Sequence, residues 1–341
     1  MLDLFPSRDA GPFGRRQKHA RGGRVPVTVI TGFLGAGKTT LLQHFLRTPE
    51  GRGTAVIVNE FGEVGIDDAL IRDCSDQTAL IGNGCVCCVV RSDLQNALRK
   101  MVIDRERGEI PPFVRIVIET SGLADPGPIL QTFATDRSLG SEFFVDVAVT
   151  VVDAATGLDT LGWSSESRKQ VILADRIILS KTDLAEPDAM PPLRARLREL
   201  NSLAEIVMAD EGKVDPHCFI ESAGDGERSA FVAEAEHSDG ITSFVLTEDR
   251  PVNWSAFTRT METLIALRGA DLLRAKGFLD VEGCRGPVLV QFVQHLPHPP
   301  VELAAWPEGK RGTRIVFITR NITETEVRAL FDAVRNLILV S

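Results

Sequence analysis

One stretch decides the fold of this chain: Gly32-Phe33-Leu34-Gly35-Ala36-Gly37-Lys38-Thr39. It fits the phosphate-loop pattern of a glycine, four residues, and then Gly-Lys-Ser/Thr. Residues 25–30 before it are typical of a buried strand, and residues 40–46 after it are typical of the first turns of a helix. Strand, glycine-rich loop and helix are the context that this motif requires. The sequence therefore predicts a phosphate-binding loop rather than a chance glycine-rich turn.

The residues of this loop have separate expected roles. Glycines let successive backbone N–H groups converge on phosphate oxygens, and the helix N-terminus adds partial positive charge. Lys38 is expected to reach the β- and γ-phosphates, and the Thr39 hydroxyl is expected to hold Mg²⁺. The stretch thus offers these nucleotide contacts: Gly32, Gly35, Ala36, Gly37, Lys38, Thr39 and Thr40.

A further apolar strand, residues 115–118, ends in Glu119 and continues into Thr120-Ser121-Gly122. An apolar strand tipped with a carboxylate is typical of the second half of a phosphate-loop nucleotidase, where the acid lies close to Mg²⁺ and the γ-phosphate. Gly122, three residues further on, is placed to give its backbone N–H to the γ-phosphate. The alternative is a strand end that carries a glutamate by chance.

The loop at residues 60–68 carries four carboxylates: Glu60, Glu63, Asp67 and Asp68. One interpretation is a switch segment near Mg²⁺ and the γ-phosphate, in which Glu60 has a catalytic part. The other is an acidic loop in solvent, with Asp67 or Asp68 capping a helix. Spacing alone does not separate the two.

Three of the six cysteines fall within four positions: Cys85, Cys87 and Cys88. Thiolates are soft ligands that select zinc, copper(I) or similar ions. Structural zinc sites have four protein ligands, whereas an incomplete set suits a metal that is handed on. A redox pair and buried packing cysteines are the alternatives. The same crowding argues against a secreted disulfide framework and favours a reducing cytoplasm.

The last motif is Ser180-Lys181-Thr182-Asp183, at the end of an apolar strand. In a guanine-reading loop of this pattern, the Asp183 carboxylate accepts from the guanine N1–H and 2-amino group, and the Lys181 stem packs on the base. Adenine lacks the 2-amino donor, so such a site rejects it. Following the two phosphate motifs, this one predicts GTP as the nucleotide.

Composition limits the class of protein. The chain has 341 residues, of which 43% are hydrophobic, and a formal net charge of −9 with a pI near 5.3. An acidic chain disfavours nucleic-acid partners, and there is no apolar run of membrane-spanning length. The N-terminal segment is basic but lacks the apolar core of a signal peptide.

These observations predict an α/β fold: a P-loop NTPase sheet flanked by helices, followed by a smaller α+β C-terminal domain. The expected parts are a flexible basic tail (1–23), a nucleotide-binding domain (24–220), a linker (221–240) and the C-terminal domain (241–341). In the last part, residues 254–268 are expected to form an amphipathic helix. A final helix is expected to start with a Thr323-x-x-Glu326 capping box.

Taken together and in this order, the motifs resemble those of CobW-type GTPases, which belong with the HypB and UreG metallochaperones. The quoted residues are Gly32 to Thr39, Asn59-Glu60-Phe61-Gly62, Gly84-Cys85-Val86-Cys87-Cys88, Glu119 to Gly122 and Ser180 to Asp183. Leu273-Arg274-Ala275-Lys276-Gly277 resembles the C-terminal domain that accompanies the CobW type. Many relatives have asparagine at the position of Ser180. Because serine is shorter, weaker hydrogen bonds to the phosphate loop are expected.

The resemblance implies a GTPase that acts as a metal chaperone or insertase. Its cysteines bind a transition metal, commonly zinc with cobalt(II) as an alternative, and GTP gates transfer to a client metalloprotein. Relatives of the HypB and UreG type form homodimers around nucleotide, which makes a nucleotide-dependent homodimer one expected state. Two alternatives stay open: a GTP-dependent activator of one specific cobalt or iron enzyme, and an NTPase with a purely structural metal site. The client, the metal and the residue that positions the attacking water do not follow from the sequence.

Overall fold

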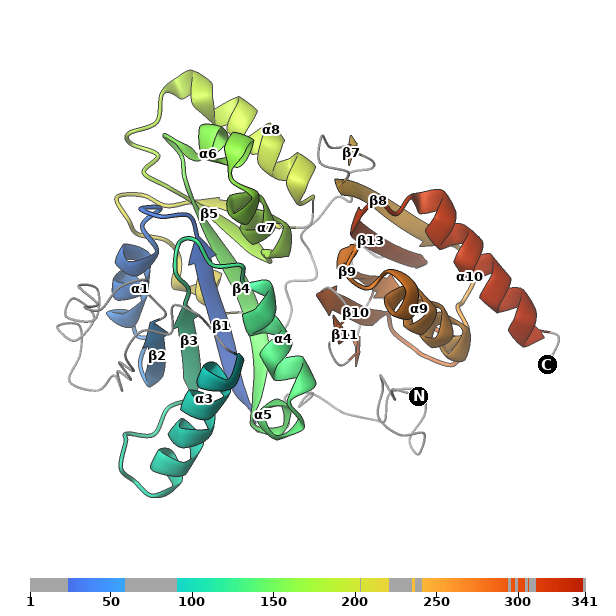
Figure 1. Cartoon of the computed structure of the whole chain (residues 1–341), viewed down its shortest axis with the longest axis horizontal. Helices are drawn as coiled ribbons and strands as arrows, with labels where there is room; N and C mark the ends of the chain where they lie inside the picture. The colour runs from blue at the N-terminus through green and yellow to red at the C-terminus, as the bar shows by residue number, and fades with distance from the viewer. Residues whose placement is uncertain are drawn as a thin grey trace. The chain divides into compact units, whose positions relative to one another are not determined.

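We describe the chain from a computed structural model (Figure 1). The structure describes residues 24–58, 91–202, 204–220, 235–236, 241–293, 296–297, 300–303, 306 and 311–339. These residues divide into two compact units, one built mainly from residues 24–220 and one mainly from residues 241–339. We call them the first unit and the second unit.

A parallel six-stranded sheet forms the centre of the first unit, as predicted. Its strands occur in the order β2-β3-β1-β4-β5-β6, and each neighbouring pair is parallel. Most of their residues are buried, which fits a sheet covered on both faces. The bounds are β1 Val25–Gly32, β2 Thr54–Val58, β3 Arg115–Glu119, β4 Phe143–Asp153, β5 Arg176–Ser180 and β6 Glu205–Met208.

Helices cover both faces of this sheet. On one face, α1 (Lys38–Leu46) and the short turn η2 (Pro216–Phe219) share a core with the strands, and the rings of Phe45 and Phe219 lie 4.8 Å apart. Three helices pack on strands through the other face: α4 (Gly127–Thr135), α5 (Arg137–Glu142) and α7 (Ser165–Leu173). The remaining elements are α3 (Arg91–Glu106), α6 (Gly157–Trp163), η1 (Pro187–Ala189) and α8 (Met190–Leu200).

The strand order decides where a ligand can bind. After β1 the chain crosses to β2 and β3 on one side, whereas after β4 it continues to β5 and β6 on the other side. In open α/β sheets, ligands bind at the carboxyl ends of the strands where this direction reverses. The phosphate loop follows β1 at this point. Glu119, Asp153 and Ser180 end β3, β4 and β5 at the same edge.

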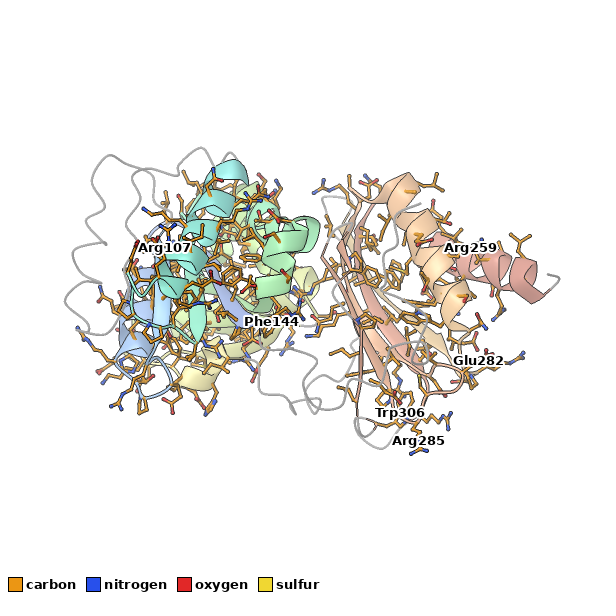
Figure 2. All side chains as sticks on the ribbon, turned by 90° about the horizontal axis from the view of Figure 1, so that it is seen from below. Arg107, Phe144, Arg259, Glu282, Arg285 and Trp306 are labelled. Atoms are coloured by element: carbon orange, nitrogen blue, oxygen red, sulfur yellow. The ribbon has the colours of Figure 1, made fainter. Side chains whose placement is uncertain are left out.

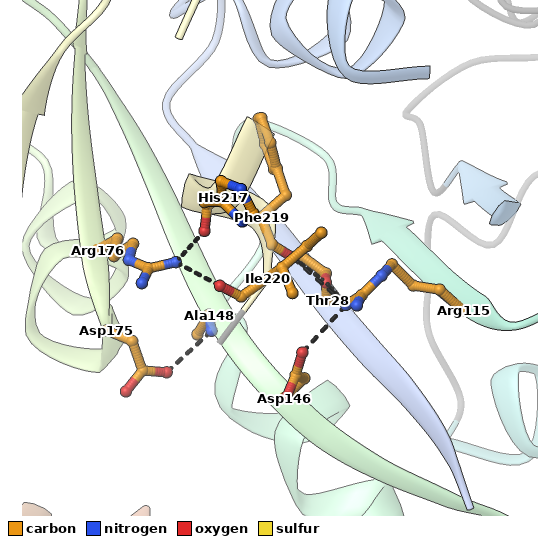
Figure 3. A network of polar contacts seen from close by, with 9 residues as sticks. All are labelled: Thr28, Arg115, Asp146, Ala148, Asp175, Arg176, His217, Phe219 and Ile220. Atoms are coloured by element: carbon orange, nitrogen blue, oxygen red, sulfur yellow. Dashed lines mark hydrogen bonds and ion pairs between the residues drawn. The ribbon is translucent and has the colours of Figure 1, made fainter. Parts of the chain in front are cut away.

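The opposite, amino end of the sheet is closed by a polar network (Figure 3). Arg115 Nη1 donates to Asp146 Oδ2 at 3.0 Å, and the Thr28 hydroxyl donates to the carbonyl of Phe219 at 2.8 Å. Arg176 Nη1 donates to the carbonyls of His217 and Ile220. The bonds from Thr28 and Arg176 fix η2, the last described segment before residue 221, to β1 and β5.

The second unit is an antiparallel sheet with two helices on one face (Figure 2). The strands are β7 Ala235–Glu236, β8 Ile241–Glu248, β9 Leu272–Leu279, β10 Val288–Val293, β11 Leu296–Pro297, β12 Val301–Glu302 and β13 Thr313–Arg320. The order is β11-β10-β9-β13-β8-β7, and β12 also pairs with β10. Phe257 and Met261 of α9 (Trp254–Arg268) and Val327 of α10 (Glu324–Leu339) pack on its core. This agrees with the predicted smaller α+β domain.

The predicted capping box begins α10. Glu326 N donates to Thr323 Oγ1, and Glu326 Oε2 accepts from Thr323 N at 2.7 Å. The hydrogen bonds from the Thr323 backbone and hydroxyl lower the pKa of the Glu326 carboxyl. This is the reciprocal pattern that satisfies the first N–H groups of a helix.

Candidate nucleotide-binding site

The phosphate loop connects β1 to α1 and has the backbone shape that its glycines permit. Gly35 and Gly37 have φ of 72° and 92°, in the left-handed region that L side chains rarely adopt. A Cβ on Gly32 would lie 2.2 Å from the carbonyl oxygen of Val151 in the neighbouring strand. Alternating backbone conformations of this kind turn successive N–H groups towards one concavity, which is the geometry of an anion site.

Lys38 and Thr39 open α1 beneath this loop. The Lys38 side chain is largely buried, and its Nζ donates to the carbonyls of Gly32 at 3.0 Å and Phe33 at 3.2 Å. The Thr39 hydroxyl donates to Glu119 Oε1 at 2.6 Å. Glu119 is 80 residues away in sequence, and it arrives here because β3 pairs with β1 in a register that sets Ile30 opposite Glu119. The predicted Mg²⁺-side hydroxyl and carboxylate are therefore in direct contact.

Gly122 lies against the phosphate loop. A Cβ at this position would come within 2.6 Å of the Leu34 backbone nitrogen, so any larger residue would push the two loops apart. The segment between Glu119 and Gly122 is anchored to β1, because Thr120 N donates to the Ile30 carbonyl at 2.9 Å. The second predicted phosphate motif is thus packed on the first.

The predicted guanine-reading loop is joined to the phosphate loop by one short hydrogen bond. Ser180 Oγ donates to the Ala36 carbonyl at 2.6 Å, across 144 positions of sequence. Although serine is shorter than asparagine, β5 brings the Ser180 side chain within hydrogen-bond distance of the phosphate loop. Lys181 has a φ of 53°, and its Nζ pairs with Asp153 Oδ2 at 2.5 Å. Asp183 is exposed at the end of the motif.

Thr40, also predicted as a contact, is exposed in the first turn of α1. A tight turn after β6 approaches it, since a Cβ on Gly212 would lie 3.2 Å from Thr40 Cγ2. Thr182 Oγ1 donates to Ala209, the first residue of the same connection. The turn and the guanine-reading loop are therefore held together beside α1.

The donor set fits a nucleotide with its magnesium ion. The left-handed glycines of the loop free its backbone N–H groups for a phosphate, and Lys38 adds a cation at the start of α1. A hydroxyl and a carboxylate in contact are oxygen ligands of the kind that Mg²⁺ prefers. Fold and site together define a phosphate-loop nucleotide-binding protein.

Several predicted residues lie outside the described residues: Glu60, Cys85, Cys87 and Cys88. Within the described ranges, no cluster of three or more His, Cys, Asp or Glu side chains could hold a metal ion. Nor does any helix in those ranges combine the length and apolar character needed to cross a membrane. Cys218 is buried in the core of the first unit, and Cys284 packs on the core of the second unit.

Sequence reasoning missed two residues that support the site. Asp153 ends β4 and holds the Lys181 ammonium, while its Oδ1 accepts from the backbone N–H groups of Ala155 and Thr156. Gln170 of α7 donates to carbonyls next to the predicted γ-phosphate contact. Asp153 could have been predicted from the sequence, because it is an acid at the end of an apolar strand, as Glu119 is. A single glutamine in a helix gives no comparable signal.

Comparisons with known proteins agree with this assignment. Residues 26–208 match the nucleotide-binding domain of the CobW/HypB/UreG family, and residues 241–335 match the C-terminal domain of the cobalamin synthesis protein CobW. The chain belongs to the CobW/HypB/UreG family.

Individual relatives cover nearly the whole chain. The zinc chaperone YjiA of Escherichia coli is 37% identical over 91% of this chain and 99% of its own length. The zinc chaperone CobW of a Sinorhizobium species is 32% identical over 92% of this chain and 98% of its own length. The crystal structure of the Zn(II)-bound YjiA GTPase superposes with a TM-score of 0.69 at 32% identity, covering 92% of this chain and 99% of that one.

Proposed function

We propose that this protein is a GTP-hydrolysing metal chaperone that carries zinc and transfers it to a client metalloprotein. The observation that carries the proposal is the hydrogen bond from Ser180 to Ala36, because it joins a base-reading loop to a phosphate loop within one site. The relatives support the cargo: two that cover most of this chain are named zinc chaperones, and one of them is described as a zinc-bound GTPase.

Guanine selectivity comes from Asp183 and Lys181. The exposed Asp183 carboxylate accepts from the N1–H and 2-amino groups of guanine, which adenine cannot match. The Lys181 stem packs on the base while its ammonium stays paired with Asp153. GTP is therefore preferred to ATP.

The phosphate end uses the residues that meet between β1 and β3. Lys38 binds the β- and γ-phosphates, and the Gly122 N–H binds the γ-phosphate. Thr39 would hold Mg²⁺, with Glu119 beside it, and this ion supplies charge neutralisation on the phosphates when bound. No arginine occurs within the three nucleotide motifs, so intrinsic hydrolysis is slow until a partner or client stimulates it.

The zinc cargo is assigned to the thiolates of Cys85, Cys87 and Cys88, with cobalt(II) as a second fitting ion. Three thiolates leave one tetrahedral position open for a ligand from a client. In this proposal, GTP orders the acidic segment that begins at Glu60, as γ-phosphate contacts do in other nucleotide switches, and this completes the metal site. Hydrolysis then loosens the metal for transfer.

The test is a zinc titration against a competing chromophoric chelator, with no nucleotide, with GDP-Mg²⁺ and with a non-hydrolysable GTP analogue and Mg²⁺. Zinc affinity should rise markedly only with the GTP analogue. The double variant Cys85→Ser, Cys87→Ser should lose this rise, whereas Cys284→Ser, outside the cluster, should keep it.

Equal zinc affinity in all three states would show that nucleotide does not gate the metal, and the chaperone proposal would fall. If the double variant keeps the rise in zinc affinity with the GTP analogue, zinc binds at residues other than the Cys85–Cys88 cluster. This second outcome needs checking, because a variant of YjiA with one glutamate and two cysteines replaced by alanine is also described as zinc-bound.

A further inference from the structure

We propose that Gln170 is a positioning residue for GTP hydrolysis: its side-chain amide fixes the peptide that follows Gly122, so that the Gly122 N–H is held ready for the γ-phosphate. This inference rests on the proposed GTPase function and adds a residue that none of the three nucleotide motifs contains. It concerns one contact between α7 and the loop after β3.

The contact between Gln170 and this loop is buried and consists of two hydrogen bonds. Gln170 is 1% exposed, and its Nε2 donates to the carbonyl of Gly122 at 3.1 Å and to the carbonyl of Ala124 at 3.0 Å. The two acceptors decide the orientation of the amide, because the reverse orientation would set Oε1 against two carbonyl oxygens. Gln170 is 48 and 46 positions away from these partners, so the contact is tertiary.

A glycine needs such support more than any other residue. Its φ and ψ are nearly unrestricted, so the direction of its N–H depends on how the two flanking peptides are held. The peptide before Gly122 is held through the Ser121 carbonyl, which accepts from Ala124 N at 3.0 Å and from Thr120 Oγ1 at 3.2 Å. The peptide after Gly122 is held by Gln170. Together they fix the residue from both sides.

Only the Nε2 half of the Gln170 amide is used in hydrogen bonds within the described part of the chain. Buried amides are normally satisfied at both atoms, yet Gln170 Oε1 has no hydrogen-bond partner in the described part of the chain. The Gly122 N–H likewise makes no hydrogen bond with the described residues. A ligand oxygen can therefore take this N–H without breaking a bond.

Because Gly122 is assigned to the γ-phosphate, which GDP lacks, replacing Gln170 should weaken binding of GTP and leave binding of GDP unchanged. A residue that only stabilised the fold would weaken both nucleotides or neither. The ratio of the two affinities thus separates positioning from a structural role.

The experiment measures, with Mg²⁺ present, the Kd of GDP and of a non-hydrolysable GTP analogue by titration calorimetry, together with single-turnover GTP hydrolysis. Gln170→Leu should leave the GDP Kd within about twofold and raise the analogue Kd about tenfold, the loss typical of one hydrogen bond to a charged group. Hydrolysis should slow about 10- to 100-fold, as when one transition-state donor is misplaced. Gln170→Asn, whose amide is one methylene short of the two carbonyls, serves as a second variant if the leucine variant does not fold.

The matched control is Thr150→Val. Thr150 Oγ1 donates to the backbone carbonyl of Gln170 at 2.7 Å, so this change removes a buried bond to the same residue and leaves its amide in place. It should keep the wild-type ratio of affinities. If the Gln170 variants weaken GDP and analogue equally, or change neither, the positioning role is overturned and the GTPase proposal stands. If the wild-type protein itself fails to bind guanine nucleotides, the proposed function falls and this inference falls with it.

Discussion

At the amino end of the parallel sheet, Arg115 pairs with Asp146, and Arg176 donates to carbonyls at η2 (Figure 3). Arg176 also pairs with Glu205. At the carboxyl end, Lys181 and Asp153 also form an ion pair, but they do so beside a glycine loop built from left-handed residues. Both ends use charges and backbone carbonyls. The amino end closes the fold, whereas the carboxyl end carries the glycine loop and the exposed Asp183 carboxylate that we propose for the nucleotide.

The difference shows that charge pairs alone do not identify a functional site. The buried pair of Arg115 and Asp146 has side chains 11% and 0% exposed, which gives a ligand no access. Asp183 is exposed, and a Cβ on Gly35 would meet no atom within 4 Å beyond its chain neighbours. Three substitutions test this contrast, and they are ordered by the size of the expected effect.

The largest effect is expected from Lys38→Ala at the carboxyl end. Because the ammonium proposed to bind the β- and γ-phosphates is lost, GTP hydrolysis should fall at least about 10²–10³-fold, measured as phosphate release. The free energy of unfolding should fall by about 2 kcal/mol, since two hydrogen bonds to backbone carbonyls are removed. Lys100→Ala, an exposed residue of α3, is the control. Hydrolysis within tenfold of wild type would contradict the assignment of Lys38.

Arg115→Met at the amino end is expected to lower stability and to leave nucleotide binding intact. Removing the guanidinium that faces the buried Asp146 carboxylate should lower the free energy of unfolding by about 3–5 kcal/mol. GDP affinity should be retained in the folded protein. Urea unfolding followed by Trp163 fluorescence in a Trp254→Phe, Trp306→Phe background reports on the first unit, because Trp163 is its tryptophan.

The control for that variant is Arg107→Met, which removes an exposed pair with Glu109 at 4.0 Å and should cost about 0.5 kcal/mol or less. A loss at Arg115 as small as this would mean that the amino-end network does not hold the unit together.

The smallest effect is expected from Asp153→Asn. The asparagine keeps an oxygen for the N–H groups of Ala155 and Thr156 but loses the charge that pairs with Lys181. GTP and GDP affinities should fall together, about tenfold, because both contain guanine, and the hydrolysis rate of bound GTP should stay unchanged. Titration of both nucleotides checks this. A lower affinity for GTP with an unchanged affinity for GDP would instead mean that Asp153 acts on the γ-phosphate.

The sequence predicted most strands and helices of both units, because buried runs and amphipathic spacing are local properties. It did not find α5 or α6, which have only six and seven residues and so show little periodicity. Glu119 could be proposed as a site residue because it ends an apolar strand. Gln170 could not, since a glutamine in α7 becomes meaningful only when the partner loop is known.

What the sequence determined by itself is a set of local patterns: a glycine loop ahead of Lys38 and Thr39, an acid at the end of β3, and a predicted guanine-reading motif at the end of β5. These follow from neighbouring residues, whose backbone preferences and spacing are fixed along the chain. Only the tertiary structure decided that Thr39 meets Glu119 and that Gln170 holds Gly122. It also decided that the short Ser180 reaches Ala36. Such contacts depend on strand order and register, which set the distances between residues far apart in sequence.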